Sequence, residues 1–326
     1  MKRPRRKFLH LAAGAVVLPA LSRLAWAQAY PSRPVKLIVG FAPGSSPDTT
    51  VRLIAQSLSN RLGQQFIVEN RPGAGTNIAT EAVVRAPADG YTLLWIPATS
   101  AINVTLFEKL SFDFLRDIVP VAAVVRLPNG MLVTQSFPAK SVPEFITYAK
   151  TNPAKVNMAF STNGGTDHLA GELFKRMAGV ELVGVPYRGG GAALYTDLIS
   201  GQVQVSFSAM AASVGYIRGD KVRLLAVTSA ARWDRMSEVP SVSEFVPGYE
   251  ATSWQGIGAP KGTPVDIVER LNKEVNAALA DAATKERLAE LGGTAMGGSP
   301  ADFARFIAEE AEKWGKVIRA ANIKPE

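Results

Sequence analysis

The sequence of 326 residues carries a formal net charge of +8 at pH 7, but six of its basic residues and no acidic residue lie in residues 1–27. The remaining 299 residues therefore carry about +2, which gives no support for nucleic-acid binding and is compatible with a small anionic ligand. Cysteine is absent and His10 and His168 are the only histidines, which excludes disulfide bonds, a cysteine nucleophile and zinc sites built on several such ligands.

Residues 1–27 have the pattern of an export signal. Residues 5–9 (RRKFL) form a twin-arginine-like region, a short apolar run follows from Leu11 to Leu21, and residues 25–27 (AWA) are typical of a cleavage site. The apolar run is too short to span a bilayer comfortably. We therefore expect export to the periplasm with cleavage after Ala27.

The first strand, loop and helix are expected within residues 35–62. The β-branched run from Val35 to Val39 predicts a strand covered on both faces. Residues 43–46 (PGSS) must turn, and apolar residues then recur at helical spacing. Backbone N–H groups of such a loop, beside a helix N-terminus, can bind an anion. The loop is interpreted either as a cradle for a carboxylate or as an ordinary turn.

Two more units of the same kind follow. Residues 65–69 predict a second strand, after which a glycine-rich loop at 71–77 opens a helix to about residue 85. Residues 91–96 predict a third strand, followed by Pro97-Ala98-Thr99-Ser100. In open α/β sheets, ligands bind outside the carboxyl ends of the strands. All three loops are therefore expected at one ligand-facing edge.

A second series of strands and helices is expected after residues 121–134, which are the candidate first crossing between two lobes. Because single cores stop growing at about 250–300 residues, the length itself favours two lobes. Further strands are predicted at 156–160, 182–186, 203–207 and 222–227. Helices are predicted at 142–150, from residue 168 onward, and after residues 187–191, where the helix ends at about residue 200. Residues 251–258 are the candidate return crossing, and helices are expected at 264–281, 283–291 and 300–320, the last packing back on the first lobe.

Catalytic motifs are missing from the sequence. It contains no Gly-x-Ser-x-Gly, His-Glu-x-x-His, Walker loop or complete Gly-x-Gly-x-x-Gly, and we expect no metal and no cofactor. His168 beside Asp167 leaves a hydrolase open, although adjacent helical residues do not face each other; the alternative is a structural histidine that donates to a neighbouring loop. Asp48 is interpreted as a first-turn acid favoured by the helix dipole or as a partner of a ligand amine or hydroxyl. Arg188 either binds a carboxylate bidentately or lies on the surface.

Seven stretches carry a specific combined pattern: residues 30–39 (YPSRPVKLIV), 68–75 (VENRPGAG), 86–93 (APADGYTL), 168–174 (HLAGELF), 185–189 (VPYRG), 225–229 (LAVTS) and 314–318 (WGKVI). Together they resemble the Bug family, the extracytoplasmic solute receptors of tripartite tricarboxylate transporters, over nearly all of the chain after residue 27. The resemblance implies a two-lobed, type II-like periplasmic binding protein whose first loop approaches the carboxylate of a small ligand.

Several positions depart from the pattern that the resemblance implies, among them Ala42 in place of a proline and Thr162 in place of a glycine. In the first loop, Phe41-Ala42-Pro43-Gly44-Ser45-Ser46-Pro47-Asp48, Ser45 takes the place of a glycine. In the loop before His168, Asp167 adds a negative charge. Ser208 follows a later strand where the family often has an acid, and this change favours a plain carboxylate over an amino acid.

We therefore predict an α/β, two-lobed periplasmic solute-binding receptor with a sheet flanked by helices in each lobe. It captures a small carboxylate by hinge closure and delivers it to the membrane subunits of a tripartite tricarboxylate-type transporter. Lobe I comprises residues 28–128 and 253–326, and lobe II residues 129–252. Alternatives are a ligand-sensing receptor of a signalling system and a periplasmic hydrolase using His168. We expect a monomer that binds no nucleic acid. The predicted ligand-binding residues are Phe41, Pro43, Gly44, Ser45, Asp48, Gly75, Asn77, Thr99, Ser100, Ser161, Asn163, Gly164, Thr166, His168, Tyr187, Arg188, Gly189 and Ser208.

Overall fold

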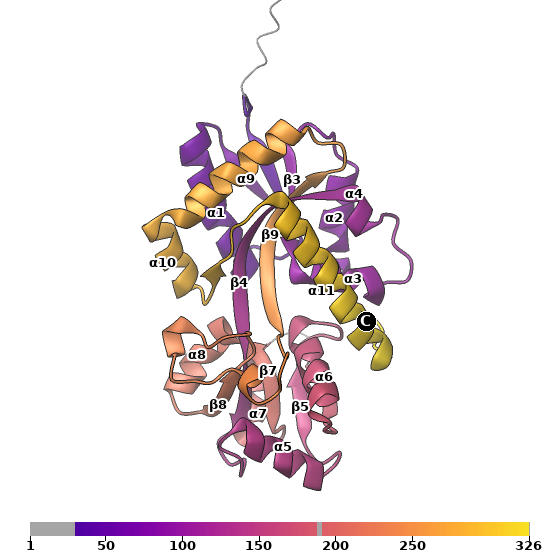
Figure 1. Ribbon diagram of the computed structural model, residues 1–326, viewed down its shortest axis with the longest axis vertical. Coiled ribbons are helices and arrows are strands. Elements are labelled where there is room, and N and C mark those ends of the chain that lie inside the picture. Colours follow the sequence, from indigo (N-terminus) through magenta and orange to yellow (C-terminus); the bar gives the residue numbers. More distant parts are fainter. Residues whose placement is uncertain (1–29, 188–190, 326) are drawn as a thin grey trace, which may run out of the picture.

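The computed structural model describes residues 30–187 and 191–325. The predicted export signal, Arg188 and Gly189 lie outside the described residues. Figure 1 shows an upper and a lower lobe, with two long strands, β4 (Ile118–Thr134) and β9 (Thr252–Pro260), running between them. Among the helices of the described ranges, none combines the length and apolar character needed to cross a bilayer.

The upper lobe is built on one mixed sheet. Its strand order is β2 (Phe66–Asn70), β1 (Val35–Val39), β3 (Thr92–Pro97), β9 and β4, with the short β10 (Thr294–Ala295) paired to β4. The first three strands are parallel, whereas β9 is antiparallel to both of its neighbours. The helices of this lobe are α1 (Ser46–Leu62), α2 (Asn77–Val84), α3 (Ala98–Leu106), α4 (Phe114–Asp117), α9 (Val265–Ala280), α10 (Ala282–Glu290) and α11 (Pro300–Ala320), with a 3-10 turn at Ala74–Thr76.

The lower lobe is built on the far end of β4. This strand pairs antiparallel with both β7 (Val205–Ala209) and β8 (Val222–Val227), and β7 continues in parallel to β5 (Asn157–Phe160) and β6 (Val183–Pro186). The helices of this lobe are α5 (Val142–Thr151), α6 (Thr166–Ala178), α7 (Gly191–Ser200) and α8 (Met210–Arg218), with 3-10 turns at Asp234–Met236 and Val242–Glu244. The predicted α/β architecture with two lobes is thus confirmed.

Several regions differ from the predicted elements, among them α4 and β10, which were not predicted. The first crossing was expected as two apolar pieces, but it is one strand, β4, of 17 residues. The strand continues through Pro128, which pairs with Thr252 of β9 in the antiparallel ladder. Helices α3 and α8 were not predicted, since their small residues give weaker helical spacing than the leucines and valines of α9.

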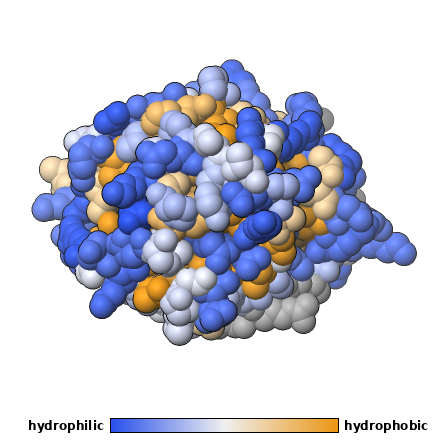
Figure 2. Space-filling view, turned by 90° about the horizontal axis from the view of Figure 1, so that it is seen from below, coloured by the Kyte–Doolittle hydropathy of each residue, from blue (hydrophilic) through white to orange (hydrophobic). Residues whose placement is uncertain are grey.

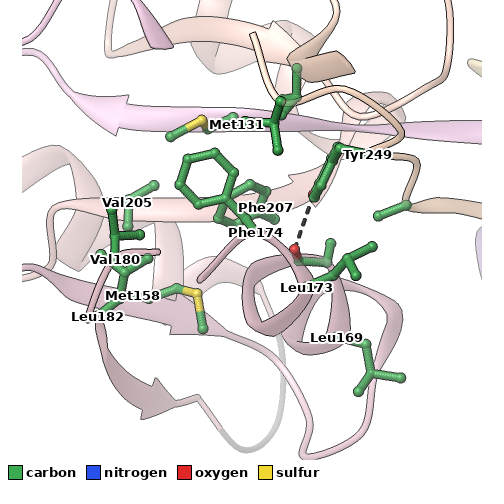
Figure 3. Close-up of a cluster of buried hydrophobic side chains, with 14 of the residues drawn as sticks. Met131, Met158, Leu169, Leu173, Phe174, Val180, Leu182, Val205, Phe207 and Tyr249 are labelled. Atoms are coloured by element: carbon green, nitrogen blue, oxygen red, sulfur yellow. Dashed lines mark hydrogen bonds between the residues drawn. The ribbon is translucent and has the colours of Figure 1, made fainter. Parts of the chain in front are cut away.

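The core of the lower lobe is an aromatic cluster under α6. Figure 3 shows Phe174, Phe207 and Tyr249 together with Met131 and Met158 from neighbouring strands. Phe174 lies 5.4 Å from Phe207 and 6.1 Å from Tyr249, measured between ring centroids. The Tyr249 hydroxyl donates to the Ala170 carbonyl at 3.0 Å, so the cluster fixes α6 against the sheet. On the outside, Figure 2 shows hydrophobic residues scattered among a majority of hydrophilic ones.

Phe174→Ala is expected to destabilise the protein strongly. The ring is fully buried, and removal of a buried phenylalanine typically costs about 3–5 kcal/mol through lost burial and the cavity left behind. Urea unfolding of the variant should show a loss of that size. Phe245→Ala is the matched control because its ring is 40% exposed. Equal losses in the two variants would contradict this account of the core.

Candidate functional site

A cleft of about 560 Å³ lies between the lobes. The upper lobe contributes the segment after β1, the 3-10 turn before α2, and the start of α3; the lower lobe contributes the segment after β5 and the starts of α7 and α8. The strands β4 and β9 form its floor through Asn129, Ser253 and Gln255. Every strand-to-helix loop of the cleft approaches from the carboxyl end of its strand, as the sequence led us to expect.

The structure brings one third of the predicted site residues to this cleft. Six line it: Phe41, Gly75, Thr99, Ser161, Thr166 and Ser208. Ten others do not: Pro43, Gly44, Ser45, Asp48, Asn77, Ser100, Asn163, Gly164, His168 and Tyr187. Of the second set, five are buried (Asp48, Asn77, Ser100, Gly164 and His168), whereas Pro43 and Gly44 are exposed to solvent. Loop identity alone therefore does not decide which residues face a ligand.

The loop between β1 and α1 contains an anion supplied by the chain itself. Asp48 accepts hydrogen bonds from the Gly44 N–H at 2.9 Å, from Arg52 Nε at 2.9 Å, and from Asn70 Nδ2 at 2.7 Å. Burial opposes ionisation, but these bonds prevail and lower the pKa of Asp48 to about 2. The Ser45 hydroxyl donates to the Ala42 carbonyl at 2.7 Å. The donors expected to cradle a ligand are therefore engaged within the loop.

The loop between β5 and α6 is organised in the same way by Asp167. One carboxylate oxygen, Oδ2, accepts from the N–H and the hydroxyl of Ser161, at 2.6 and 2.7 Å, and Oδ1 accepts from the His168 N–H at 2.9 Å. Burial raises the pKa of Asp167, and the hydrogen bonds from Ser161 and His168 oppose that rise. Unlike Asp48, Asp167 itself lines the cleft.

His168 stands apart from the cleft. Its ring stacks on Phe160 with centroids 3.8 Å apart, and its Nδ1 accepts a hydrogen bond from the Gly164 N–H at 3.1 Å. The expected bond to a neighbouring loop therefore exists, but the loop is the donor and the imidazole the acceptor. Together with Asn163 and Glu172, His168 lines a separate depression between α6 and the C-terminal residues.

Protonation of His168 should couple the stability of the protein to pH. Burial, with a contribution from Lys175, lowers the pKa of His168 to about 4 from its ordinary 6.5. The unfolded chain takes up a proton below about pH 6.5, whereas the folded protein resists it down to about pH 4. We therefore expect the free energy of unfolding to fall by about 3 kcal/mol between pH 7 and pH 4 through this residue. Urea unfolding at the two pH values should show a smaller drop for His168→Gln; equal drops would contradict the assignment.

The start of α3 provides open donors, as does the start of α8, which also reaches the cleft without a side-chain cap or a first-turn acid. The first turn of α3 contains no acidic residue and its N-terminus has no side-chain cap, while Pro97, Ala98 and Thr99 line the cleft. The first N–H groups of a helix have no partner within the helix and attract negative charge. In α1 and α6 this charge comes from Asp48 and Asp167. In α3 the chain supplies no such charge in the first turn, so the N–H groups there can bind a ligand anion or water.

Thr76 lies beside this helix start in a strained conformation. Its φ of 79° is unusual for a β-branched residue, and its hydroxyl lies 3.4 Å from that of Thr99. A Cβ on Gly40 would come within 2.5 Å of the Thr76 Cβ, so only glycine allows β1 to end so close to this turn. Strain of this kind is common where a backbone is held for binding.

Asn129 is a cleft residue that the sequence analysis missed. It is only 1% exposed, and its side-chain nitrogen has no hydrogen-bond partner in the described structure. Its main chain is fixed by Thr228, whose hydroxyl lies 2.9 Å from the Asn129 nitrogen and 3.0 Å from its carbonyl oxygen. Buried polar groups are normally paired. A polar residue inside the apolar run of β4 was the signal that could have revealed it.

The lower-lobe side of the cleft is largely uncharged. Leu194 and Tyr195 from α7, and Ala209 and Ala212 at the start of α8, line it. The Tyr195 hydroxyl is paired with Ser213 Oγ at 2.8 Å. On the floor, Gln255 accepts from the indole N–H of Trp95 at 3.2 Å. The lower lobe also contributes the polar side chains of Ser161, Thr162, Thr166, Asp167 and Ser208, so both lobes bring polar and apolar groups to the cleft.

Comparison with known proteins gives consistent matches. The family described as "Tripartite tricarboxylate transporter family receptor" matches residues 50–323. Protein BugT of Bordetella pertussis is 35% identical over 301 residues, which cover 91% of this chain and 92% of that protein. The structure of Rpa4515 of R. palustris with adipate has a TM-score of 0.78 and 40% identity, and covers 91% of this chain and 100% of that one. The structure of MatC (Rpa3494) from Rhodopseudomonas palustris with bound malate has a TM-score of 0.73 and 33% identity, and covers 89% and 100%.

Proposed function

Because the chain belongs to the receptor family of the tripartite tricarboxylate transporters, we propose that its interlobe cleft binds a small carboxylate. It is a periplasmic solute-binding receptor, as its resemblance to the Bug family implied. The relatives bound to adipate and malate support a carboxylate as the ligand class. Delivery of the bound ligand to membrane transporter subunits, by a monomeric receptor, completes the proposal.

The observation that carries the site is the open N-terminus of α3. The ligand carboxylate docks against its first N–H groups, beside the hydroxyls of Thr76 and Thr99, and the amide of Asn129 supplies a further donor. This differs from the loop between β1 and α1, where Asp48 already accepts from the Gly44 N–H. Of the other predicted residues, Phe41, Gly75, Ser161, Thr166 and Ser208 remain candidates because they line the cleft.

The proposed domain division follows the two crossings. Lobe I comprises residues 28–128 and 253–326, and lobe II residues 129–252. The division is supported by the pairing of Pro128 with Thr252 in the antiparallel ladder of β4 and β9, because both boundaries then lie side by side. Bending of two adjacent strands at one level would close the lobes over a ligand.

Binding without chemical conversion is the favoured role for this cleft. A hydrolase using His168 would require an imidazole in contact with the ligand, whereas this ring lies outside the cleft and uses Nδ1 as an acceptor from Gly164. We expect His168→Ala to retain carboxylate affinity within about threefold. A loss of more than tenfold, or turnover of an ester by the wild-type protein, would favour the hydrolase.

We propose that the export signal is cleaved after Ala27, which removes residues 1–27. N-terminal sequencing of the protein from the periplasmic fraction should therefore begin at Gln28. The binding proposal itself is tested by mass spectrometry of ligand that purifies with the protein, and by melting-temperature shifts with a panel of carboxylates. Small-angle scattering should show a more compact particle with the bound ligand. No shift with any carboxylate, and no compaction, would contradict the proposal.

A further inference from the structure

Residues 225–229 (LAVTS) form the end of β8 and the two residues that follow it. The apolar residues of this stretch are buried in the lower lobe, as expected for an inner strand. Thr228 is polar, yet its side chain is also fully buried, and it does not line the cleft. Because a buried hydroxyl needs hydrogen-bond partners, the contacts of Thr228 show what this residue does.

Thr228 holds the main chain of Asn129 on the crossing strand β4. Its hydroxyl accepts from the Asn129 N–H at 2.9 Å and donates to the Asn129 carbonyl at 3.0 Å. The Thr228 N–H donates to that same carbonyl at 2.9 Å, and the Thr228 carbonyl accepts from the N–H of Ala251, directly before β9, at 2.9 Å. One residue of the lower lobe therefore ties together the two segments that cross between the lobes.

The hydroxyl is needed because β4 changes partners at this point. The strand is paired with β9 up to Pro128, and with β7 from Asn129 onward. A buried main-chain N–H group needs an acceptor, and the N–H of Asn129 finds it in the Thr228 hydroxyl. A hydroxyl both donates and accepts, so it serves the N–H and the carbonyl of Asn129 together. An apolar side chain of the same shape serves neither.

The Asn129 side chain thereby has a fixed place in the cleft. In the ladder of β4 and β7, Asn129 lies opposite Ala209, which precedes the first turn of α8. Asn129 lines the cleft, and its side-chain nitrogen is buried without a hydrogen-bond partner in the described structure. A donor that is already held in place loses less freedom when a ligand binds, so the contacts that hold Asn129 bear on affinity.

We propose that Thr228 is a positioning residue of the ligand site, an inference that rests on the proposed binding of a carboxylate in the cleft. Its hydroxyl fixes the main chain of Asn129 where β4 changes partners, and it thereby holds the Asn129 amide toward the bound carboxylate. Thr228 itself does not touch the ligand. Its contribution to affinity therefore passes through Asn129.

Calorimetric titration of the mature protein with adipate, malate and benzoate tests this inference, and the carboxylate that binds most tightly is used for every variant. Thr228→Val keeps the shape of the side chain without its hydroxyl, and should raise the Kd by about fivefold or more. Thr228→Ser keeps the hydroxyl as donor and acceptor and should stay within about twofold of the wild-type Kd.

A double-mutant cycle with Asn129→Ala separates positioning from a general structural role. Asn129→Ala alone should raise the Kd by about tenfold or more, as expected for a lost hydrogen bond to a charged group. In that background Thr228→Val should change the Kd by less than about twofold, because two residues that act as one unit are not additive. Equal effects of Thr228→Val with and without the Asn129 side chain would overturn the inference while the proposed function stands.

Thr263→Val is the matched control. Thr263 is also buried and its hydroxyl donates to the Pro260 carbonyl at 2.8 Å, but it lies beyond the far end of β9 and does not line the cleft. Its substitution should leave the Kd unchanged. A crystal structure of the wild-type protein with the same carboxylate decides where Thr228→Val fails to fold: an Asn129 amide out of hydrogen-bond distance of the carboxylate would overturn the inference. Binding of none of the three carboxylates by the wild-type protein would overturn the proposed function as well.

Discussion

Thr99→Asp is expected to weaken carboxylate binding by roughly 100-fold or more while leaving the fold intact. The substitution places a carboxylate in the first turn of α3, where the proposed ligand carboxylate docks. Two like charges about 4 Å apart repel by on the order of 4 kcal/mol at an effective dielectric constant of 20, and the new side chain also competes for the same N–H groups. The same acid favours the helix by about 0.3–1 kcal/mol, so binding and stability should change in opposite directions.

Two variants separate charge from shape in this experiment. Thr99→Asn has nearly the same size as the aspartate variant without its charge, and should lose less than tenfold in affinity. Ala283→Asp adds an acid to the first turn of α10, at an exposed position away from the cleft, and should leave affinity unchanged. Titration with the ligand that purifies with the protein measures all three. Unchanged affinity of Thr99→Asp would move the carboxylate site away from α3.

Glu310→Ala is expected to lower the free energy of unfolding by about 3–5 kcal/mol, as for other broken buried ion pairs. Glu310 is only 6% exposed and accepts from the indole N–H groups of Trp254 and Trp314, at 3.0 and 2.9 Å. Lys313 also pairs with it. Trp254 belongs to the crossing strand β9 and Trp314 to α11, so this carboxylate joins the C-terminal helix to the strand between the lobes. Its removal leaves two buried donors and a cation without their partner.

Glu309→Ala provides the control on the same helix. Glu309 is exposed, and loss of its carboxylate should change the free energy of unfolding by less than about 0.5 kcal/mol. Glu310→Gln retains one acceptor oxygen and should fall between the two alanine variants. Urea unfolding followed by tryptophan fluorescence gives all three values. Similar midpoints for Glu309→Ala and Glu310→Ala would show that the buried network contributes little to stability.

Most strands and the long helices could be predicted because local patterns decide them. Val35–Val39 is β-branched and apolar, and it forms the buried strand β1. The apolar spacing of Val268, Leu271 and Val275 forms the inner face of α9. Helix α3 was missed because alanine, serine and threonine fit a loop as well as a first helical turn. This omission mattered, since α3, like the equally unpredicted α8, brings an open N-terminus to the cleft.

The predicted site residues divide between the interlobe cleft and the loops around it. Six predicted residues line the cleft, whereas the loop first assigned to the carboxylate is filled by Asp48. The arrangement around Asp48 in α1 also depends on Asn70, which lies at the end of β2, 22 positions further along the chain. Asn129 was missed for a related reason, because a missing hydrogen-bond partner is visible only when all neighbours are known.

The sequence by itself determined the family, the two-lobed α/β fold and the edge of the sheets where loops gather. These follow from periodicity, from small-residue loops after strands, and from motifs that recur in the family. Only the tertiary structure decided which donors are free: those of the first loop are taken by Asp48, and those of the second by Asp167. Most of these hydrogen bonds join residues one to six positions apart, but the sequence does not show which way each carboxylate turns, because that depends on the three-dimensional path of the loop.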